Sequence, residues 1–391
     1  MDVSIYFEKI GIDKIIDKEQ VHPNQLVNFI GINTLDSGFP ELDAVDIALI
    51  GVNEGRVSIN NSGSANSPDI VRKYLYSLFR PDHSLRIADL GNINPGNSIN
   101  DTYFAVRDVV GTLLKKNIVP VIIGGGQDLT YANYLAYESI GKIINIVTVD
   151  NAFDLGSTDS PLTSRTYLNK VITHQPSYLF NFSNIGFQTY FVDNEAIELM
   201  KKLYFDVYRL GIVQNDIEEV EPMVRNADMI SVDVSSVRMS DAPGNGNSTP
   251  NGFYGEELCR IMRYAGLSDK LSSIGIYEIN PEMDRNGQTS HLAAQAIWYF
   301  IDGFYNRKMD FPVKDKKFYV KYRVVIKAIQ NEIVFYKSKK SDRWWMEVPC
   351  PTKLKSKYDR HYLVPCSYRD YQTAMREEIP DRWWQAYQKL M

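Results

Sequence analysis

Cysteine is scarce in this chain of 391 residues. The three cysteines, Cys259, Cys350 and Cys366, are odd in number and show no metal-ligand spacing. This pattern gives no sign of a disulfide framework and suits a reducing compartment, so we predict a cytoplasmic protein. Long hydrophobic runs are missing as well. No run approaches the ~18 apolar residues of a membrane span, and the first residues lack the pattern of a secretory signal. We therefore predict a protein with no membrane span.

Histidine is also rare, with five in the whole chain. Only His174 falls in a predicted loop near the ends of the predicted strands, where ligands usually bind. A solvated loop histidine is the more common outcome, and as a general base His174 would still need an activated water. The sequence therefore predicts no histidine-based catalysis.

Charge is unevenly distributed along the chain. Residues 307–391 carry 20 Lys and Arg against 10 Asp and Glu, a net charge of +10, whereas residues 1–306 carry 23 against 38, a net charge of −15. The switch falls in a polar segment that Pro312 interrupts. We predict two units, an acidic α/β domain over residues 1–306 (the body) and a basic, Trp-rich domain over residues 307–391 (the extension).

The body alternates apolar runs with helical patterns. Residues 46–52 form one such run, and an amphipathic helix follows from Ser67, its predicted N-cap, and Pro68. Alternation of this kind predicts a parallel sheet that is covered by helices on both faces, which is a three-layer α/β/α fold.

Five apolar runs of the body end in polar residues, and these runs begin at Val121, Ile146, Asn184, Ile230 and Ile274. The carboxyl ends of parallel strands line one edge of a sheet, where ligands collect. The following polar residues are therefore expected to converge on one crevice: Gln127, Asp150, Asp154, Asp233, Ser235 and Glu278.

The order and spacing of these runs resemble the ureohydrolase family of arginase, agmatinase and formimidoylglutamase, and formimidoylglutamase most closely. The family signatures are Gly-Gly-x-His, Asp-x-His-x-Asp and Asp-x-Asp, which together hold two manganese ions. They match Gly-Gly-Gly-Gln127, Asp150-Asn-Ala-Phe-Asp154 and Asp233-Val-Ser235 of this chain. The resemblance covers about residues 45–305 and implies an arginase-like fold.

The resemblance also implies a degenerate metal site. Asp150 and Asp233 match the positions that bridge both ions, and the other ligand positions hold Gln127, Ala152, Asp154 and Ser235. Ala152 has no ligand atom, and the neutral hydroxyl of Ser235 is a poor ligand for a divalent cation. Without two ions, a water molecule stays a weak nucleophile at neutral pH. We therefore predict no cofactor and no catalytic residue. A single ion held by Asp150, Asp154 and Asp233 is the alternative.

Two further residues match the family's substrate pocket. Glu278 matches the glutamate that receives the guanidinium or formimidoyl group of the substrate. Ser164 lies in the segment Thr163-Ser-Arg165, which resembles the substrate-binding loop. Both are candidates for a ligand pocket. The structural interpretation of the aspartates is that they serve as helix caps or as hydrogen-bond acceptors in loops.

The extension alternates apolar and polar residues over 317–326, 332–337 and 343–348, and helical segments then begin near Ser367 and Pro380. This pattern predicts a small α+β domain with three strands.

Four of the five tryptophans lie in the extension, as the doublets Trp344-Trp345 and Trp383-Trp384. A small domain needs large aromatic side chains for its core, so packing is one interpretation. Neighbouring side chains of a strand point to opposite faces, so one ring of the first doublet is a candidate for an exposed hot spot that binds a protein partner. The positive charge is also able to dock on the acidic body, either in the same chain or in a homo-oligomer. Nucleic acid is not the expected partner, because the whole chain has a net charge of −5 and the basic residues are scattered.

From these features we predict a catalytically inactive pseudoenzyme with the ureohydrolase fold, acting as a scaffold or assembly factor in a protein complex. The alternative is a metal-dependent formimidoylglutamase or amidinohydrolase that hydrolyses a non-peptide C–N bond with an altered or mononuclear metal site. An enzyme of this kind should bind manganese and release formamide, urea or ammonia from a formimidoyl or guanidino substrate.

Overall fold

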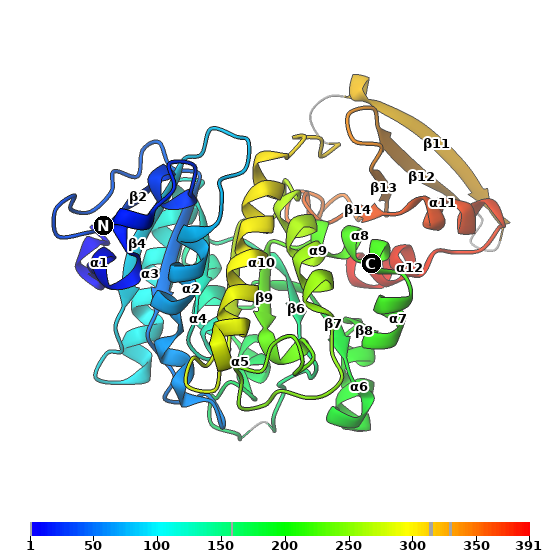
Figure 1. The fold of residues 1–391 in the computed structure, drawn as a ribbon. Helices are drawn as coiled ribbons and strands as arrows, with labels where there is room; N and C mark the ends of the chain where they lie inside the picture. The colour runs from blue at the N-terminus through cyan, green and yellow to red at the C-terminus, as the bar shows by residue number, and fades with distance from the viewer. Residues whose placement is uncertain (1, 158, 313–315, 328–330) are drawn as a thin grey trace.

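The computed structural model describes residues 2–157, 159–312, 316–327 and 331–391, and one large sheet runs through the body (Figure 1). Its strands are β1 Phe7–Glu8, β2 Ile30–Ile32, β3 Ile47–Val52, β4 Ile87–Ile93, β5 Val119–Ile123, β6 Ile144–Val149, β7 Leu179–Phe187, β8 Asp206–Arg209, β9 Met229–Asp233 and β10 Ser273–Tyr277. They lie in the order β1-β4-β3-β5-β10-β9-β6-β7-β8, with β2 also paired to β4. The pairs are parallel except that of β1 with β4.

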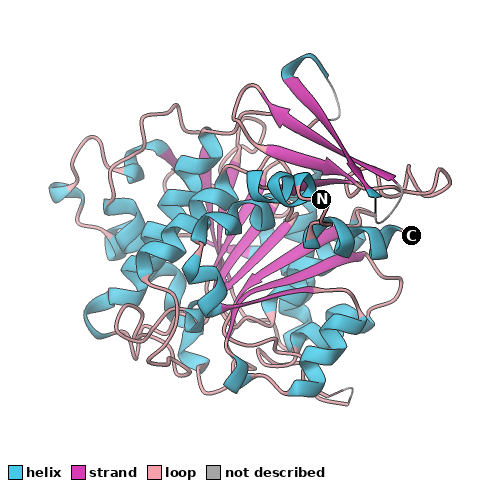
Figure 2. Cartoon of the chain, turned by 90° about the vertical axis from the view of Figure 1, so that its right-hand side faces the viewer, coloured by secondary structure: helices cyan, strands magenta, loops and turns pink. Residues whose placement is uncertain are grey.

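Helices lie on both sides of this sheet (Figure 2). They are α1 Ile12–Ile15, α2 Ser67–Ser77, α3 Ile99–Lys115, α4 Leu129–Ser139, α5 Tyr167–Thr173, α6 Asn194–Lys202, α7 Leu210–Asn215, α8 Val220–Arg225, α9 Gly255–Gly266 and α10 Gln288–Tyr305. Alternate residues of β3 enter different cores, since Ile47 and Leu49 pack in one cluster and Ala48 and Ile50 in another. The predicted three-layer α/β/α arrangement is confirmed. Within the described residues, no helix has both the length and the apolar character needed to cross a membrane.

The start of α2 differs by one residue from the prediction. Ser67 is the first helical residue, with Pro68 next to it, and Asn66 occupies the N-cap position without a side-chain cap. The hydroxyl of Ser67 donates instead to the backbone carbonyl of Ser64, at 2.8 Å. Ser67 therefore ties the helix to the preceding turn rather than capping it.

The extension contains a separate antiparallel sheet of four strands, β11 Tyr319–Ile326, β12 Asn331–Ser338, β13 Trp344–Glu347 and β14 Leu363–Cys366. Two helices follow, α11 Tyr368–Met375 and α12 Asp381–Leu390. Ser367 and Asp370 form a capping box at the start of α11. The predicted small α+β unit is confirmed, although β14 was not foreseen because Pro365 interrupts its short apolar pattern. Residues 313–315, in the polar segment where the net charge changes sign, lie outside the described residues.

Three of the four candidate partner-binding tryptophans are buried. Trp344, Trp345 and Trp383 are 7%, 2% and 2% exposed, whereas Trp384 is 44% exposed. The rings of the first doublet do point to opposite faces. Trp344 packs in the core of the extension, and Trp345 lies under the guanidinium of Arg225 in the body, 4.4 Å from it. The expectation that one ring of this doublet is exposed is therefore wrong, because the body covers the second face of the small sheet.

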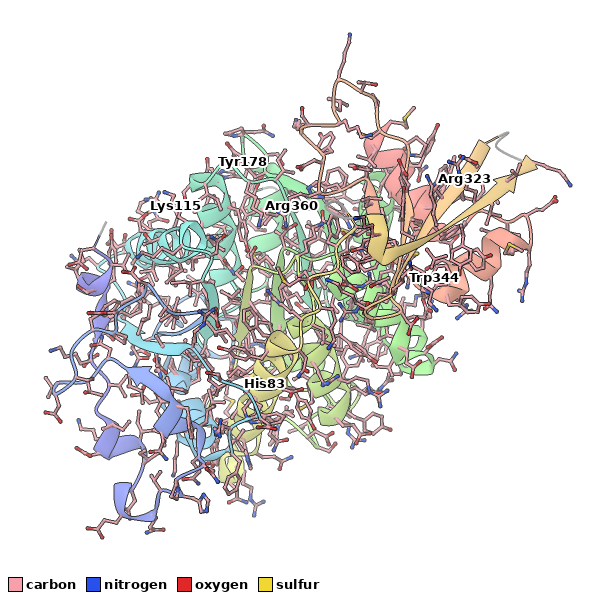
Figure 3. The ribbon with its side chains drawn as sticks, turned by 90° about the horizontal axis from the view of Figure 1, so that it is seen from above. His83, Lys115, Tyr178, Arg323, Trp344 and Arg360 are labelled. Atoms are coloured by element: carbon pink, nitrogen blue, oxygen red, sulfur yellow. The ribbon has the colours of Figure 1, made fainter. Side chains whose placement is uncertain are left out.

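The basic extension docks on the acidic body of the same chain. Arg382 of α12 pairs with Glu219 at 2.8 Å, and Lys389 pairs with Asp206 at 3.3 Å. Arg360, between β13 and β14, reaches over the body, whereas Arg323 lies on the outlying strands of the extension (Figure 3). Intramolecular docking, one of the expected outcomes of the charge asymmetry, is therefore present. A protein partner for the extension stays a prediction.

Candidate metal centre

Four neighbouring strands, β5, β10, β9 and β6, end at the same edge of the large sheet. β5 leads through three glycines to Gln127, β6 leads to Asp150, β9 ends at Asp233, and β10 leads to Glu278. The turn after β5 requires glycine at Gly124, which has a φ of +83° and lies so close to α2 that a Cβ would clash. Parallel strand order thus brings the predicted site residues to one place.

Asp150, Asp154 and Asp233 form a buried cluster whose candidate ligand oxygens all lie within 4.8 Å of one another. Local turns orient two of these side chains. The Oδ1 atom of Asp150 accepts a hydrogen bond from the backbone N–H of Ala152 at 3.1 Å. The Oδ1 atom of Asp233 accepts one from the backbone N–H of Ser235 at 2.6 Å. Each aspartate therefore uses one oxygen in its own loop and keeps the other for the cluster.

Several buried oxygens at this edge have no hydrogen-bond partner among the described residues. They are Asp150 Oδ2, Asp154 Oδ2, Gln127 Oε1 and Ser235 Oγ. A buried acceptor without a partner costs free energy, so native structures supply a proton donor, an ordered water or a cation at such places. The free oxygens of Asp150, Asp154 and Gln127 are therefore available as ligands of an oxygen-coordinated cation.

The electrostatics of the cluster point the same way. Burial raises the pKa of Asp150, and the charges of Asp154 and Asp233 raise it further. Burial also raises the pKa of Asp233 to about 6, although the Arg165 guanidinium opposes the rise. Three carboxylates in a water-poor site repel one another, and a divalent cation between them relieves that repulsion.

Arg165 is the cation that the structure places at the cluster. Its Nη1 atom lies 3.3 Å from Asp154 Oδ1. Arg165, Asp154 and Ala152 also line an open cleft of about 670 Å³, whose outer part includes Phe191 and Leu199 of the segment that leads into and forms α6. The cleft thus connects Asp154, the outermost member of the cluster that lines it, to the surface.

Glu278 lies deeper than the cleft. Its Oε1 atom accepts from the backbone N–H of Gln127 at 2.9 Å, and its Oε2 atom accepts from Ser58 at 2.6 Å and from Asn61 at 2.7 Å. Burial and the charge of Asp233 raise the pKa of Glu278 to about 8, although these hydrogen bonds favour the ionised form. The carboxylate is thus held in one orientation within reach of the cluster's charge.

Ser164 is placed differently from the expectation. Its hydroxyl accepts from the backbone N–H of Ile59 at 3.0 Å, and its own N–H donates to the carbonyl of Val57 at 3.1 Å. The described lining of the cleft includes Arg165 but neither Ser164 nor Glu278. Ser164 therefore fixes the loop, and its neighbour Arg165 faces the site.

The residues present fit one hard divalent cation and not the full pair of the family. Asp150, Asp154 and Asp233 supply three carboxylates, and the amide oxygen of Gln127 is a fourth hard donor at the same edge of the sheet. Ala152 occupies a position where the family has a ligand of the second ion, and its methyl group cannot bind a metal. The role of Arg165 was missed from the sequence; the signal was an arginine in the predicted substrate loop beside an excess of acidic positions.

Comparisons with known proteins identify the family of this chain. A model of the arginase family matches residues 45–302. The formimidoylglutamase of Staphylococcus haemolyticus is 27% identical over 305 residues, covering 74% of this chain and 96% of that protein. The formimidoylglutamase of Bacillus subtilis is 25% identical over 276 residues, covering 66% and 86%.

Solved structures share the fold. The B. subtilis formimidoylglutamase superposes with a TM-score of 0.66 at 21% identity, over 75% of this chain and 95% of that one. The Trypanosoma cruzi formiminoglutamase with Mn²⁺ superposes with a TM-score of 0.63 at 19% identity, over 69% and 99%. These likenesses establish the arginase-like fold.

One expectation from the sequence is overturned by these comparisons. The prediction that the protein uses no cofactor is wrong, because the match is to a family of manganese hydrolases and a similar structure is that of a formiminoglutamase with Mn²⁺. The lost ligands at Ala152 and Ser235 reduce the donor set but leave a buried carboxylate cluster in place. Since the family model matches residues 45–302, more than half of the chain, the chain belongs to the arginase family.

Proposed function

We propose that the protein is a metal-dependent hydrolase of linear amidines, similar to formimidoylglutamase, that works with one divalent cation at Asp150, Asp154 and Asp233. The observation that carries the proposal is the pair of buried carboxylate oxygens without a partner, Asp150 Oδ2 and Asp154 Oδ2. Buried charges persist when they are paired or when they coordinate a metal. Carboxylate oxygens suit Mn²⁺ or Mg²⁺.

The charge of the site supports an amidine as the substrate. An amidinium group is planar and cationic, so a site with an excess of carboxylates attracts it. Glu278 is the residue proposed to receive this group. Ser58 and Asn61 occupy its Oε2 atom, whereas its Oε1 atom accepts only from the Gln127 N–H and keeps a second lone pair for the substrate. The relatives named formimidoylglutamase, one of them aligned over 96% of its length, support the same substrate class.

The proposed reaction breaks one C–N bond. The oxygen of water goes to the amidine carbon, one water hydrogen goes to the leaving nitrogen and the other goes to the nitrogen that stays on the carbon. The products are therefore an amide, such as formamide, and a free amine. When bound, a divalent cation supplies a water of lowered pKa as the nucleophile. The chain's own contribution is to hold the three aspartates in position, to orient Glu278 and to admit substrate through the cleft beside Asp154.

A direct assay tests this function. Protein loaded with Mn²⁺ is incubated with N-formimidoyl-L-glutamate, agmatine or arginine, and the release of formamide, urea and ammonia is measured. We expect release from the formimidoyl substrate, and its loss in Asp233→Asn. The matched control is Asp43→Asn, because Asp43 is an exposed aspartate that pairs with Lys116 far from the cluster. Absence of product from every amidine with the metal bound overturns the proposal.

A non-catalytic scaffold is the second candidate, and Ala152 is the observation that favours it. A methyl group at this position and the neutral hydroxyl of Ser235 leave the second family ion without dedicated ligands. In this case the cluster binds a cation without turnover, and the extension carries the function by binding a protein. Metal-dependent turnover that exceeds that of Asp233→Asn rules this candidate out.

A further inference from the structure

We propose that Arg165 is a tethered counter-ion of the aspartate cluster, and that its guanidinium must leave Asp154 when a divalent cation enters. This inference rests on the proposed metal site and concerns how that site is kept in the metal-free protein. It makes Arg165 a positioning and gating residue whose side chain has two locations.

Arg165 and Asp154 form an ion pair between the buried cluster and the cleft. The Asp154 side chain is 2% exposed and the Arg165 side chain is 29% exposed, with 3.3 Å between Nη1 and Oδ1. Burial acts to lower the pKa of Arg165, but the charges of Asp154, Asp233 and Asp150 outweigh burial and raise it. The guanidinium therefore balances the charge of the whole cluster and not of Asp154 alone.

Asp154 is one of the three carboxylates that are close enough together to hold an ion. Its Oδ1 atom faces the guanidinium and its Oδ2 atom has no partner among the described residues, so an ion on Oδ2 would share this carboxylate with Arg165. A divalent ion on Asp154 would lie close to the guanidinium as Arg165 now stands, and two cations at such a separation in a water-poor site repel strongly. Metal binding and the docked position of Arg165 are therefore in competition.

The loop that carries Arg165 is held firmly, so the side chain is the part that moves. On one side, the Ser164 N–H donates to the carbonyl of Val57 and the Ser164 hydroxyl accepts from the N–H of Ile59. The hydroxyls of Thr163 and Thr166 lie 2.9 Å apart across the turn, and the Arg165 N–H donates to the Thr163 hydroxyl at 3.2 Å. Rotation about the side-chain bonds of Arg165 is enough to release Asp154.

The cleft provides a second location for the guanidinium. It has a volume of about 670 Å³, and Asp193 and Glu195 line it together with Arg165. Asp193 already accepts the backbone N–H of Glu195 at 3.0 Å, as the N-cap of α6. The exposed carboxylate of Glu195 is thus the acidic group that is able to receive Arg165 when it swings outward.

Competition of this kind has two linked consequences. Removing the guanidinium should strengthen metal binding, because the ion no longer has to displace it. The same change should weaken the metal-free protein, because three buried carboxylates then lose their counter-ion. If Arg165 had a purely structural role, its removal would lower the stability of the metal-free protein without strengthening metal binding.

Three variants test the inference: Arg165→Gln, which removes the charge; Arg165→Lys, which keeps a charge on a smaller head group; and Lys201→Gln. Lys201 lies on α6 in a surface ion pair with Glu198, so its loss controls for a general change in charge near the cleft. Metal-free proteins are titrated with Mn²⁺ by calorimetry, and their melting temperatures are measured with and without Mn²⁺. We expect Arg165→Gln to bind Mn²⁺ at least ~10-fold more tightly than wild type and to melt lower without metal. Arg165→Lys should bind more weakly than Arg165→Gln, and Lys201→Gln should match wild type.

The outcomes separate this inference from the proposed function. Mn²⁺ binding by Arg165→Gln that is equal to or weaker than that of wild type, or is undetectable in both, overturns the role of Arg165. Tighter binding by Arg165→Gln in a protein that hydrolyses no amidine supports the counter-ion role and removes the proposed activity.

Discussion

The guanidinium of Arg360, in the extension, lies 2.7 Å from the carboxylate of Asp228, immediately before β9. Asp228 is completely buried and also faces Lys142 at 3.4 Å and Lys270 at 3.7 Å. The strand that follows ends at Asp233, one of the proposed metal ligands. The extension is therefore anchored to the strand that positions the metal site, at the opposite edge of the sheet.

The buried ion pair should matter more than the exposed ones between the same two units. We expect Arg360→Gln to lower the free energy of unfolding by ~1–3 kcal/mol, because it removes a charged partner from a buried carboxylate. The matched control is Arg369→Gln. Arg369 is 71% exposed and pairs with Asp216, which is 41% exposed, so its loss should change stability by no more than ~0.5 kcal/mol. Urea unfolding of both variants measures the difference, and equal effects would show that Arg360 adds nothing beyond a surface contact.

The same carboxylate gives the protein an acid-dependent stability. Burial acts to raise the pKa of Asp228, but Lys270, Arg360 and Lys142 outweigh burial and lower the pKa from its ordinary 3.8 to about 2. Because the folded pKa lies below the unfolded one, the stabilisation is fully present above about pH 4 and is lost as the pH falls toward about 2, an effect of about 2 kcal/mol. Unfolding at about pH 5 and about pH 3 should show a smaller loss for Asp228→Asn than for wild type. If Asp228→Asn loses as much stability between these pH values as wild type does, other groups cause the acid sensitivity.

The tryptophans of the extension should separate by burial. Trp345→Ala should cost ~3–5 kcal/mol of unfolding free energy, because it leaves a cavity under Arg225. Trp384→Ala should cost less than ~1 kcal/mol, since Trp384 is 44% exposed and stacks on Tyr387 with a ring separation of 5.7 Å. Denaturant unfolding followed by tryptophan fluorescence measures both. A large loss for Trp384→Ala would mean that this ring also belongs to the core.

Restoring the family ligands should restore a second ion. The triple variant Gln127→His, Ala152→His and Ser235→Asp is expected to raise the metal content from one to two Mn²⁺ per chain, because each new side chain supplies a donor at a family position. Ala152 lines the cleft, which leaves room for an imidazole ring, whereas Ser235 is fully buried. Elemental analysis after gel filtration gives the count. A count of one would show that the buried space at Ser235 no longer admits a carboxylate in the ligand position.

The arrangement of the body was accessible from the sequence because it follows from local patterns and one topological rule. Apolar runs that end in polar residues predicted parallel strands, and parallel strands bring Gln127, Asp150, Asp233 and Glu278 to one edge. The position of Arg165 was not accessible. Its side chain reaches Asp154 from a loop whose path depends on hydrogen bonds to Val57 and Ile59, about 100 residues earlier in the chain.

The extension shows the same division between local and long-range information. Alternation along the strand correctly predicted that Trp344 and Trp345 point to opposite faces. The sequence did not show which face would meet solvent, because Arg225 covers Trp345 from a helix of the body. The family resemblance likewise supplied the ligand positions, whereas the unpartnered oxygens of Asp150 and Asp154 became visible only in the folded structure.

The most direct test of the proposed function is a titration of metal-free protein with Mn²⁺ while formamide release from N-formimidoyl-L-glutamate is followed. The three-carboxylate cluster predicts that the rate rises with added metal and reaches its plateau at one Mn²⁺ per chain, with no rise in Asp150→Asn. A protein that takes up one Mn²⁺ and releases no formamide, or one whose activity appears only when a second ion binds, would contradict a mononuclear amidine hydrolase.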